Sequence, residues 1–260
     1  MKEIKYSVVL DFDGCCNSRT GGPGILWDLV GMAELAKTIA EVPTSFSVCL
    51  LTGRGVQYGF AISEALGLIK SHFGHWSGFE GGLIMAQHTP SWLCEYADCV
   101  TQEYLDAREI LNITLVSEIK KRGGKQEKKE VCLTYNPPDG GSLDELLKIV
   151  QDYIGDLKLA EIVKCTRTNS AVDIWPVGGS KEKNILDLCY RNGVDPQNVI
   201  YVDDAKSGIP VFGAVGQSGA PFTNAKEVWD AAKIHAPNKG SAPLETAWVI
   251  RSFVEYIGAQ

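Results

Sequence analysis

Acidic and hydroxyl side chains follow directly after the most apolar runs of this sequence. Asp11 and Asp13 come after VVL, Thr52 comes after FSVCLL, and Asp203 and Asp204 come after NVIYV. Aspartate is a poor strand former, so local preference is overruled at these positions. Such conflicts are expected where side chains serve chemistry rather than folding.

A cluster of these four aspartates requires a cation. Two unit charges about 4 Å apart repel by roughly 4 kcal/mol at an effective dielectric constant near 20. One lysine, such as Lys181 in GGSKEKN, does not offset several such pairs. Ligation by oxygen alone, with no histidine or cysteine partner, is typical of Mg²⁺ rather than Zn²⁺. The sequence therefore predicts a magnesium site.

A divalent cation beside carboxylates, a threonine hydroxyl and a lysine suits phosphoryl transfer, because cations stabilise charge on the transferring oxygens. One carboxylate can attack phosphorus and form an aspartyl-phosphate, and a second can act as acid and then as base. Asp11 and Asp13 are two residues apart, so the turn that begins at Asp13 must aim both into one crevice. Gly14 permits that turn.

The elements that position these residues are predicted to be alternating strands and helices of an α/β core. The three apolar runs are continuous rather than alternating, which predicts parallel strands buried on both faces. Residues 24–42, 55–68 and 180–194 carry apolar residues at helical spacing, and the last segment ends in NG, a predicted helix C-cap. Ligands bind at the carboxyl ends of such strands, so the polar residues are expected to meet there.

The segment 91–176 has a different pattern, which predicts an α+β module inserted into a doubly wound α/β core formed by residues 1–90 and 177–260. Within and just beyond it we expect helices at 102–122 and 143–155 and strands at 130–136, 160–166 and 171–177. The basic stretch KKRGGKQEKK, residues 120–129, is interpreted as a solvated loop.

Composition excludes some classes of partner. The chain has 260 residues, 45% of them hydrophobic, and a formal net charge of -7, which disfavours a nucleic-acid partner. The apolar stretch near the N-terminus is too short for a secretory signal or a membrane span, so we expect a cytoplasmic protein without membrane contact. The eight cysteines contain no CxxC pair and are expected to be buried reduced thiols. His72 and His75 have no evident ligand partner, so structural roles are favoured.

These residues resemble the four ordered motifs of the haloacid dehalogenase superfamily, specifically its phosphatases with a large cap between the second and third motifs. VVLDFDG resembles the first motif, CLLTGR the second, Lys181 in GGSKEKN the third, and VIYVDDAKSGIP the fourth. GFEGGLIM and TNAKEVWDAA extend the likeness over most of the core. The resemblance implies a Rossmann-like parallel sheet with an inserted α+β cap.

The resemblance also implies roles. Asp11 is the nucleophile and a magnesium ligand, and Asp13 is the general acid and base whose backbone carbonyl also reaches the metal. Thr52 and Lys181 hold the phosphoryl group. Asp203 anchors the magnesium, and Asp204 supports it directly or through water. Two positions depart from the usual pattern: Cys15 replaces a threonine, and DDAKSG stands where many relatives have Gly-Asp-x-x-Asn-Asp.

The expected function is magnesium-dependent hydrolysis of a small phosphorylated metabolite, such as a sugar phosphate or a phosphoglycolate-like acid, by a monomer or homodimer. A sugar phosphomutase and a catalytically silent regulatory protein are the alternatives. Substrate contacts are expected from Thr52, Gly53, Arg54 and Lys181 in the core and from Arg167 and Asn169 in the inserted segment, where Trp175 offers an aromatic face. Thr52 has a structural alternative as a helix N-cap, and Arg54 as the partner of a carboxylate.

Overall fold

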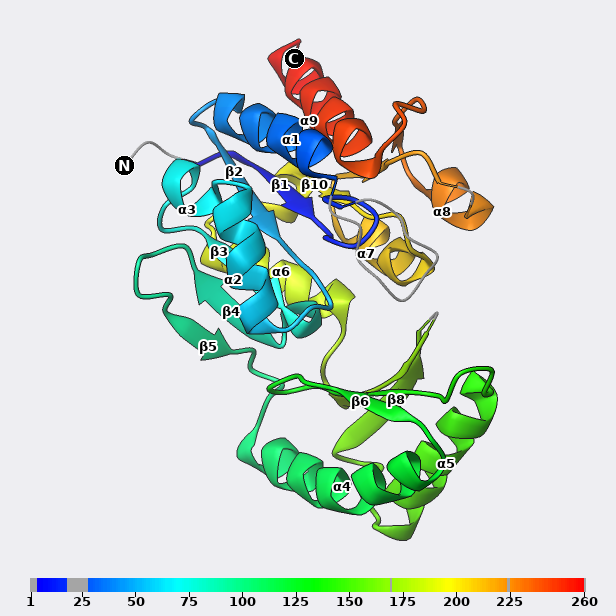
Figure 1. Ribbon diagram of the computed structural model, residues 1–260. Helices are drawn as coiled ribbons and strands as arrows, with labels where there is room; N and C mark the ends of the chain where they lie inside the picture. The colour runs from blue at the N-terminus through cyan, green and yellow to red at the C-terminus, as the bar shows by residue number, and fades with distance from the viewer. Residues whose placement is uncertain (1–3, 18–27, 169, 224, 260) are drawn as a thin grey trace. The chain divides into compact units, whose positions relative to one another are not determined.

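The computed structural model describes residues 4–17, 28–168, 170–223 and 225–259. The chain forms two compact units. The larger unit comprises residues 1–95 and 181–260, and the smaller unit comprises residues 96–180. Each unit has its own sheet and its own helices (Figure 1).

The larger unit contains a five-stranded parallel sheet in the order β12-β11-β10-β1-β2. Its strands are β1 (Tyr6–Leu10), β2 (Phe46–Leu50), β10 (Val199–Val202), β11 (Gln217–Ala220) and β12 (Ile234–His235). The three predicted strands are confirmed and are neighbours, with β1 between β10 and β2. The sequence did not reveal β11, QSGA, or the two-residue β12, because neither carries a run of β-branched residues.

Helices cover both faces of this sheet (Figure 1). They are α1 (Leu29–Glu41), α2 (Val56–Ala65), α3 (Leu68–Ser71), α6 (Lys181–Arg191), α7 (Ile209–Ala214), α8 (Lys226–Ala231) and α9 (Ala242–Gly258). On one face, Tyr201 of β10 packs in a core with Ile185 of α6 and Phe212 of α7. On the other face, α9 lies so close to β11 that a side chain at Gly219 would strike Val249. The expected doubly wound α/β architecture is therefore confirmed.

The larger unit also contains a second, three-stranded sheet. It consists of β3 (Trp76–Phe79), β4 (Ile84–Gln87) and β5 (Cys94–Tyr96), in that order. A 3-10 turn, Glu80–Gly82, joins β3 to β4. Glu80 itself has φ 51, a left-handed conformation that is unusual for a residue other than glycine. This turn is hydrogen-bonded to the segment that follows β2.

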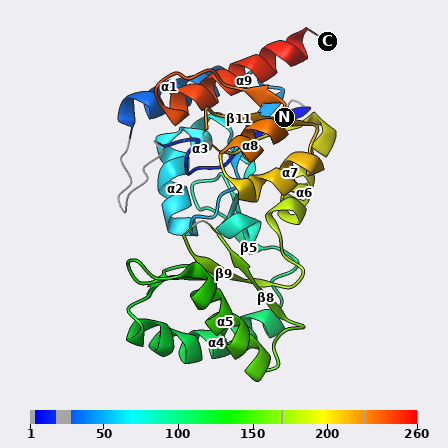
Figure 2. The same ribbon diagram turned by 90° about the vertical axis from the view of Figure 1, so that its right-hand side faces the viewer.

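The smaller unit is an α+β module. Its antiparallel sheet has the order β6-β7-β9-β8, with β6 (Lys125–Glu127), β7 (Leu133–Asn136), β8 (Val163–Arg167) and β9 (Val172–Pro176). The helices α4 (Gln102–Lys121) and α5 (Leu143–Asp156) pack beside it (Figure 2). Thr101 and Ser142 cap their N-termini. The interpretation of residues 120–129 as a loop was wrong for residues 120–121, which end α4, and for residues 125–127, which form the edge strand β6.

None of the eight cysteines is in a disulfide, as predicted, and five of the eight are buried. Cys94 is exposed, contrary to the expectation of burial. Among the described residues, no helix is long and apolar enough to span a membrane.

Two buried histidines take part in hydrogen bonds along the outer edge of β2. The backbone N–H of Val48 donates to His72 Nδ1 at 3.3 Å, and that of Leu50 donates to Ser77 Oγ at 2.9 Å. Ser77 Oγ in turn lies 2.7 Å from His88 Nε2, and His88 Nδ1 lies 3.2 Å from the carbonyl oxygen of His72. His72 Nδ1 and His88 Nε2 must therefore be the unprotonated nitrogens, which confirms a structural role for His72. Burial lowers the pKa of both imidazoles to about 4.

These histidines predict a loss of stability in mild acid. A folded-state pKa below the unfolded value of 6.5 means that the unfolded chain binds protons first as the pH falls. The contribution is complete above pH 6.5 and is lost between that value and about pH 4. From pH 7.5 to pH 5.5 the free energy of unfolding should fall by on the order of 1 kcal/mol for each histidine. Urea unfolding followed by circular dichroism measures it.

The variant His72→Asn keeps an acceptor near the Nδ1 position but cannot titrate, so its stability should depend less on pH than that of the wild type. The matched control is His235→Asn, at an exposed histidine. Equal pH dependence in the wild type and both variants would contradict this account.

Candidate active site

The predicted residues lie at the carboxyl ends of three neighbouring strands. Asp11 follows β1, Thr52 lies just after β2, and Asp203 follows β10. The parallel pairing of β1 with β10 continues as far as Asp11, whose N–H donates to Val202 O at 2.9 Å. The chain first places β2 on one side of β1, and much later it places β10 on the other side of β1, so the direction in which strands are added reverses at β1. This reversal is where open parallel sheets form ligand crevices.

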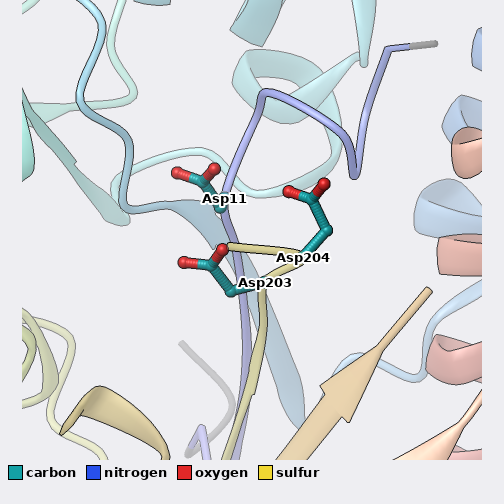
Figure 3. Close-up of side chains that lie close together, drawn as sticks. All are labelled: Asp11, Asp203 and Asp204. Carbon is teal, nitrogen blue, oxygen red and sulfur yellow. The ribbon is translucent and has the colours of Figure 1, made fainter. Parts of the chain in front are cut away.

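Three carboxyl groups gather at this edge. Asp11, Asp203 and Asp204 each offer one oxygen, and these oxygens lie within 4.8 Å of one another. Figure 3 shows Asp11 on the segment after β1 beside the adjacent pair after β10. Asp11 is 7% exposed and Asp203 is fully buried, so water screens their repulsion poorly.

Lys181, the first residue of α6, bridges two of these carboxylates. Its Nζ lies 3.0 Å from Asp11 Oδ1 and 3.0 Å from Asp203 Oδ2. The two carboxylates raise the pKa of Lys181 above its ordinary value despite the opposing effect of burial, so the ammonium is charged. The sequence predicted that Lys181 would lie beside these aspartates, and the structure places it there.

One ammonium does not balance three carboxylates. Burial is the largest cause that raises the pKa of Asp11, and with the smaller contributions of Asp203 and Asp13 it brings this pKa to about 8 against the lowering effect of Lys181. An additional cation at the cluster would favour the ionised form of Asp11. The donor set consists of carboxylate oxygens alone, which is the set that Mg²⁺ prefers. The residues present therefore fit a magnesium ion held by Asp11, Asp203 and Asp204.

Two glycines make room for these carboxyl groups. Gly14 has φ +76, and a Cβ on it would lie 2.2 Å from Asp204 Oδ2. A Cβ on Gly208 would lie 2.4 Å from the carboxyl carbon of Asp203. Gly14 thus permits the turn that the sequence predicted, and it also provides the space that Asp204 occupies.

Arg54 pairs with Asp13. Its Nε donates to Asp13 Oδ2 at 2.6 Å, and its Nη2 donates to Oδ1 at 2.8 Å. The guanidinium also lies 5.3 Å from the ring centroid of Tyr58. Of the two roles considered for Arg54, the structure shows the carboxylate partner. The Asp13 side chain is 45% exposed, so this pair fixes its orientation while leaving it accessible to solvent.

Thr52 is positioned by the turn between β3 and β4. Its N–H donates to Gly78 O at 3.0 Å, and its carbonyl accepts from Gly81 N at 2.7 Å. Its Oγ1 accepts from Arg54 N at 3.2 Å. The alternative role of Thr52 as the N-cap of α2 is wrong, because the cap is Gly55. Gly53 stands beside open space, since a Cβ on it would meet no heavy atom of the described residues within 4 Å beyond its chain neighbours.

Two predicted substrate contacts, Arg167 and Asn169, belong to the smaller unit. Arg167 forms an ion pair with Asp144 at the start of α5. Asn169 lies outside the described residues. Trp175 is on β9, and its indole Nε1 is buried without a hydrogen-bond partner among the described residues.

Sequence reasoning missed Tyr201. Its hydroxyl donates to Asp203 Oδ2 at 2.6 Å, and both side chains are fully buried. The available signal was spacing, because residues two apart on a strand share a face of the sheet. Cys15 and Cys16 adjoin the site, and burial, as the largest cause, raises the pKa of both thiols well above the ordinary value. They are therefore poor nucleophiles.

The sequence matches no protein-family model and no curated protein. Solved structures do resemble it. A haloacid dehalogenase-like hydrolase from Bacteroides thetaiotaomicron is 15% identical, with a TM-score of 0.68 over 97% of this chain and 99% of that one. The sucrose-phosphatase from Synechocystis sp. PCC6803, solved with sucrose and phosphate, is 14% identical, with a TM-score of 0.67 over 96% and 98%.

The C-terminal domain of trehalose-6-phosphate phosphatase from C. albicans is 13% identical, with a TM-score of 0.69 over 98% of this chain and 93% of that one. Each similarity spans nearly the whole of both chains and thus includes both compact units. This chain therefore has the fold of the haloacid dehalogenase-like hydrolases, a doubly wound α/β core with an inserted α+β unit.

Proposed function

We propose that this protein is a magnesium-dependent phosphatase that hydrolyses a small sugar phosphate through an aspartyl-phosphate. The observation that carries the proposal is the convergence of Asp11, Asp203 and Asp204 around one point, with Lys181 bridging two of them. Asp13 and Thr52 adjoin the same strand ends. This arrangement supplies a nucleophile, an acid and base, and positive charge for a phosphoryl group.

In the first step, a carboxylate oxygen of Asp11 attacks phosphorus. A bond forms between that oxygen and phosphorus, and the bond from phosphorus to the sugar oxygen breaks. Asp13, in its protonated form, gives its proton to the departing oxygen. Lys181 stabilises negative charge on the phosphoryl oxygens, and the hydroxyl of Thr52 donates a hydrogen bond to them.

In the second step, Asp13 accepts a proton from water while the water oxygen attacks phosphorus. The bond between phosphorus and the Asp11 oxygen breaks, which releases inorganic phosphate and restores the carboxylate. A magnesium ion held by Asp11, Asp203 and Asp204 would supply charge stabilisation and orientation of the phosphoryl group. Arg54 holds the Asp13 carboxylate in one orientation between turnovers.

The substrate class rests on two of the similar structures, whose names specify a sucrose phosphatase and a trehalose-6-phosphate phosphatase. We propose that the smaller unit, residues 96–180, recognises the sugar, because the strand ends of the core offer little beyond phosphoryl contacts. A phosphorylated metabolite and eight cysteines without a disulfide are both consistent with a cytoplasmic protein.

The nucleophile is tested by Asp11→Asn. The amide keeps the shape of the side chain but removes the attacking charge, so release of phosphate from trehalose 6-phosphate or p-nitrophenyl phosphate should fall to the assay background. The matched control is Asp152→Asn, which removes a carboxylate from an exposed pair with Lys148 and should leave the rate unchanged. A folded Asp11→Asn protein that retains most of the wild-type rate would exclude the covalent mechanism.

The metal is tested by chelation. Phosphate release should stop after treatment with EDTA and return with excess Mg²⁺, because the carboxylate cluster needs a cation. Calcium should substitute poorly, since its larger and looser coordination disturbs an in-line reaction. Undiminished turnover in exhaustively chelated protein would show that the cluster works without a metal.

The Arg54–Asp13 pair is tested by Arg54→Lys. Lysine keeps the positive charge but cannot make the two parallel hydrogen bonds, so Asp13 becomes less well oriented. We expect kcat to fall by on the order of tenfold or more. Arg191→Lys is the control, because Arg191 pairs with Asp187 and Glu95 outside the site. A similar loss of activity in both variants would indicate a general structural effect.

A further inference from the structure

Tyr201 lies beneath the carboxylate cluster on the side of the sheet that α6 covers. Side chains two residues apart on a strand share a face, so Tyr201 on β10 and Asp203 just beyond it point the same way. Lys181 of α6 lies on that side too, with its Nζ 5.2 Å from the Tyr201 ring centroid. The tyrosine ring therefore lies beside Lys181, and its hydroxyl donates to Asp203.

The ring and the hydroxyl of Tyr201 have different roles. The ring packs in an apolar core whose members include Val9 of β1 and Cys49 of β2. A phenylalanine would fill that space equally well. A buried hydroxyl costs free energy unless it is hydrogen-bonded, and this one donates to Asp203 Oδ2 at 2.6 Å. Its hydrogen bond to Asp203 is thus the feature that distinguishes tyrosine from phenylalanine at this position.

Three donors orient the Asp203 carboxylate. Ala205 N donates to Oδ1 at 2.8 Å, and Oδ2 accepts from both Tyr201 and Lys181. Gly208 packs against the carboxyl carbon from a further direction. Lys181 also binds Asp11, so this ammonium is shared between two carboxylates. The Tyr201 hydroxyl is uncharged and rigidly attached, so it holds Oδ2 independently of events at Asp11.

We propose that Tyr201 is a positioning residue that sets the affinity of this site for a divalent cation by fixing the orientation of Asp203. The inference rests on the proposed function in one respect, because it takes Asp11, Asp203 and Asp204 as the cation ligands. Groups that hydrogen-bond to metal ligands commonly change metal affinity by roughly 10- to 100-fold when they are removed. The Tyr201 hydroxyl is fully buried and donates to Asp203, so we expect its effect to be on metal binding and not on the chemical step.

The experiment compares the full-length wild type with Tyr201→Phe. The dissociation constant for Mg²⁺ is measured by titration calorimetry without substrate, and the Mg²⁺ concentration for half-maximal phosphate release is measured separately. We expect both to rise by about tenfold or more in Tyr201→Phe. At saturating Mg²⁺, kcat should return to within a few-fold of the wild-type value, a split that a merely structural defect would not produce.

The matched control is Tyr104→Phe. It removes another buried, hydrogen-bonded hydroxyl, which donates to the carbonyl oxygens of Val131 and Ile174 in the smaller unit. Its affinity for Mg²⁺ should equal that of the wild type. Thermal unfolding with and without Mg²⁺ provides a second measurement, in which the shift in midpoint on adding Mg²⁺ should be smaller for Tyr201→Phe alone.

A double-variant cycle with Asp203→Asn tests the route of the effect. If Tyr201 acts through Asp203, adding Tyr201→Phe to Asp203→Asn changes Mg²⁺ affinity no further. Unchanged Mg²⁺ affinity in folded Tyr201→Phe, or equal weakening in Tyr104→Phe, would overturn the inference and leave the proposed function intact. A wild type that binds no Mg²⁺ would instead refute the metal site of the proposed function.

Discussion

Mutual repulsion among buried carboxylates is the constraint on which the rest of this site depends. Asp11, Asp203 and Asp204 follow two adjacent strands, and their oxygens approach within 4.8 Å, with Asp11 and Asp203 buried and Asp204 half-buried. All three carboxylates can be ionised together only if positive charge is close by. Lys181 supplies part of it by joining the ends of β1 and β10, which makes the first turn of α6 a component of the site as well as of the core.

The alternation of side chains along parallel strands determines which partners each carboxylate can have. Asp203 shares the face of Tyr201, so it meets the hydroxyl and the ammonium on the α6 side. Asp204 comes one residue later and lies instead against Gly14, where a side chain would occupy the position of its carboxyl group. Two consecutive acidic residues therefore have unlike surroundings: one is held by three donors, and the other fills a space that a glycine leaves.

Features that arise from local sequence were predictable, and features that arise from tertiary contacts were not. The runs at 6–10, 46–51 and 198–202 are strongly apolar, so three strands and the polar residues at their ends could be identified. β6, β11 and β12 are short or polar and exist because a neighbouring strand pairs with them. The pairing of Arg54 with Asp13 joins residues 41 positions apart, and nothing in either neighbourhood specifies it. The role of Tyr201 could not be inferred from the sequence, because an aromatic residue within an apolar strand is normally a core residue.

The same distinction explains why the chemistry of this chain is easier to infer than its specificity. Phosphoryl transfer requires particular groups at particular strand ends, so a few residue types at fixed spacing indicate it. Recognition of a sugar requires only polar and aromatic surfaces of suitable shape, which many sequences supply. Arg167 shows the consequence, because a cation that suited an anionic ligand on sequence grounds is paired with Asp144 within its own unit. On the proposal that the smaller unit recognises the sugar, a panel of sugar phosphates tests substrate identity more directly than any motif.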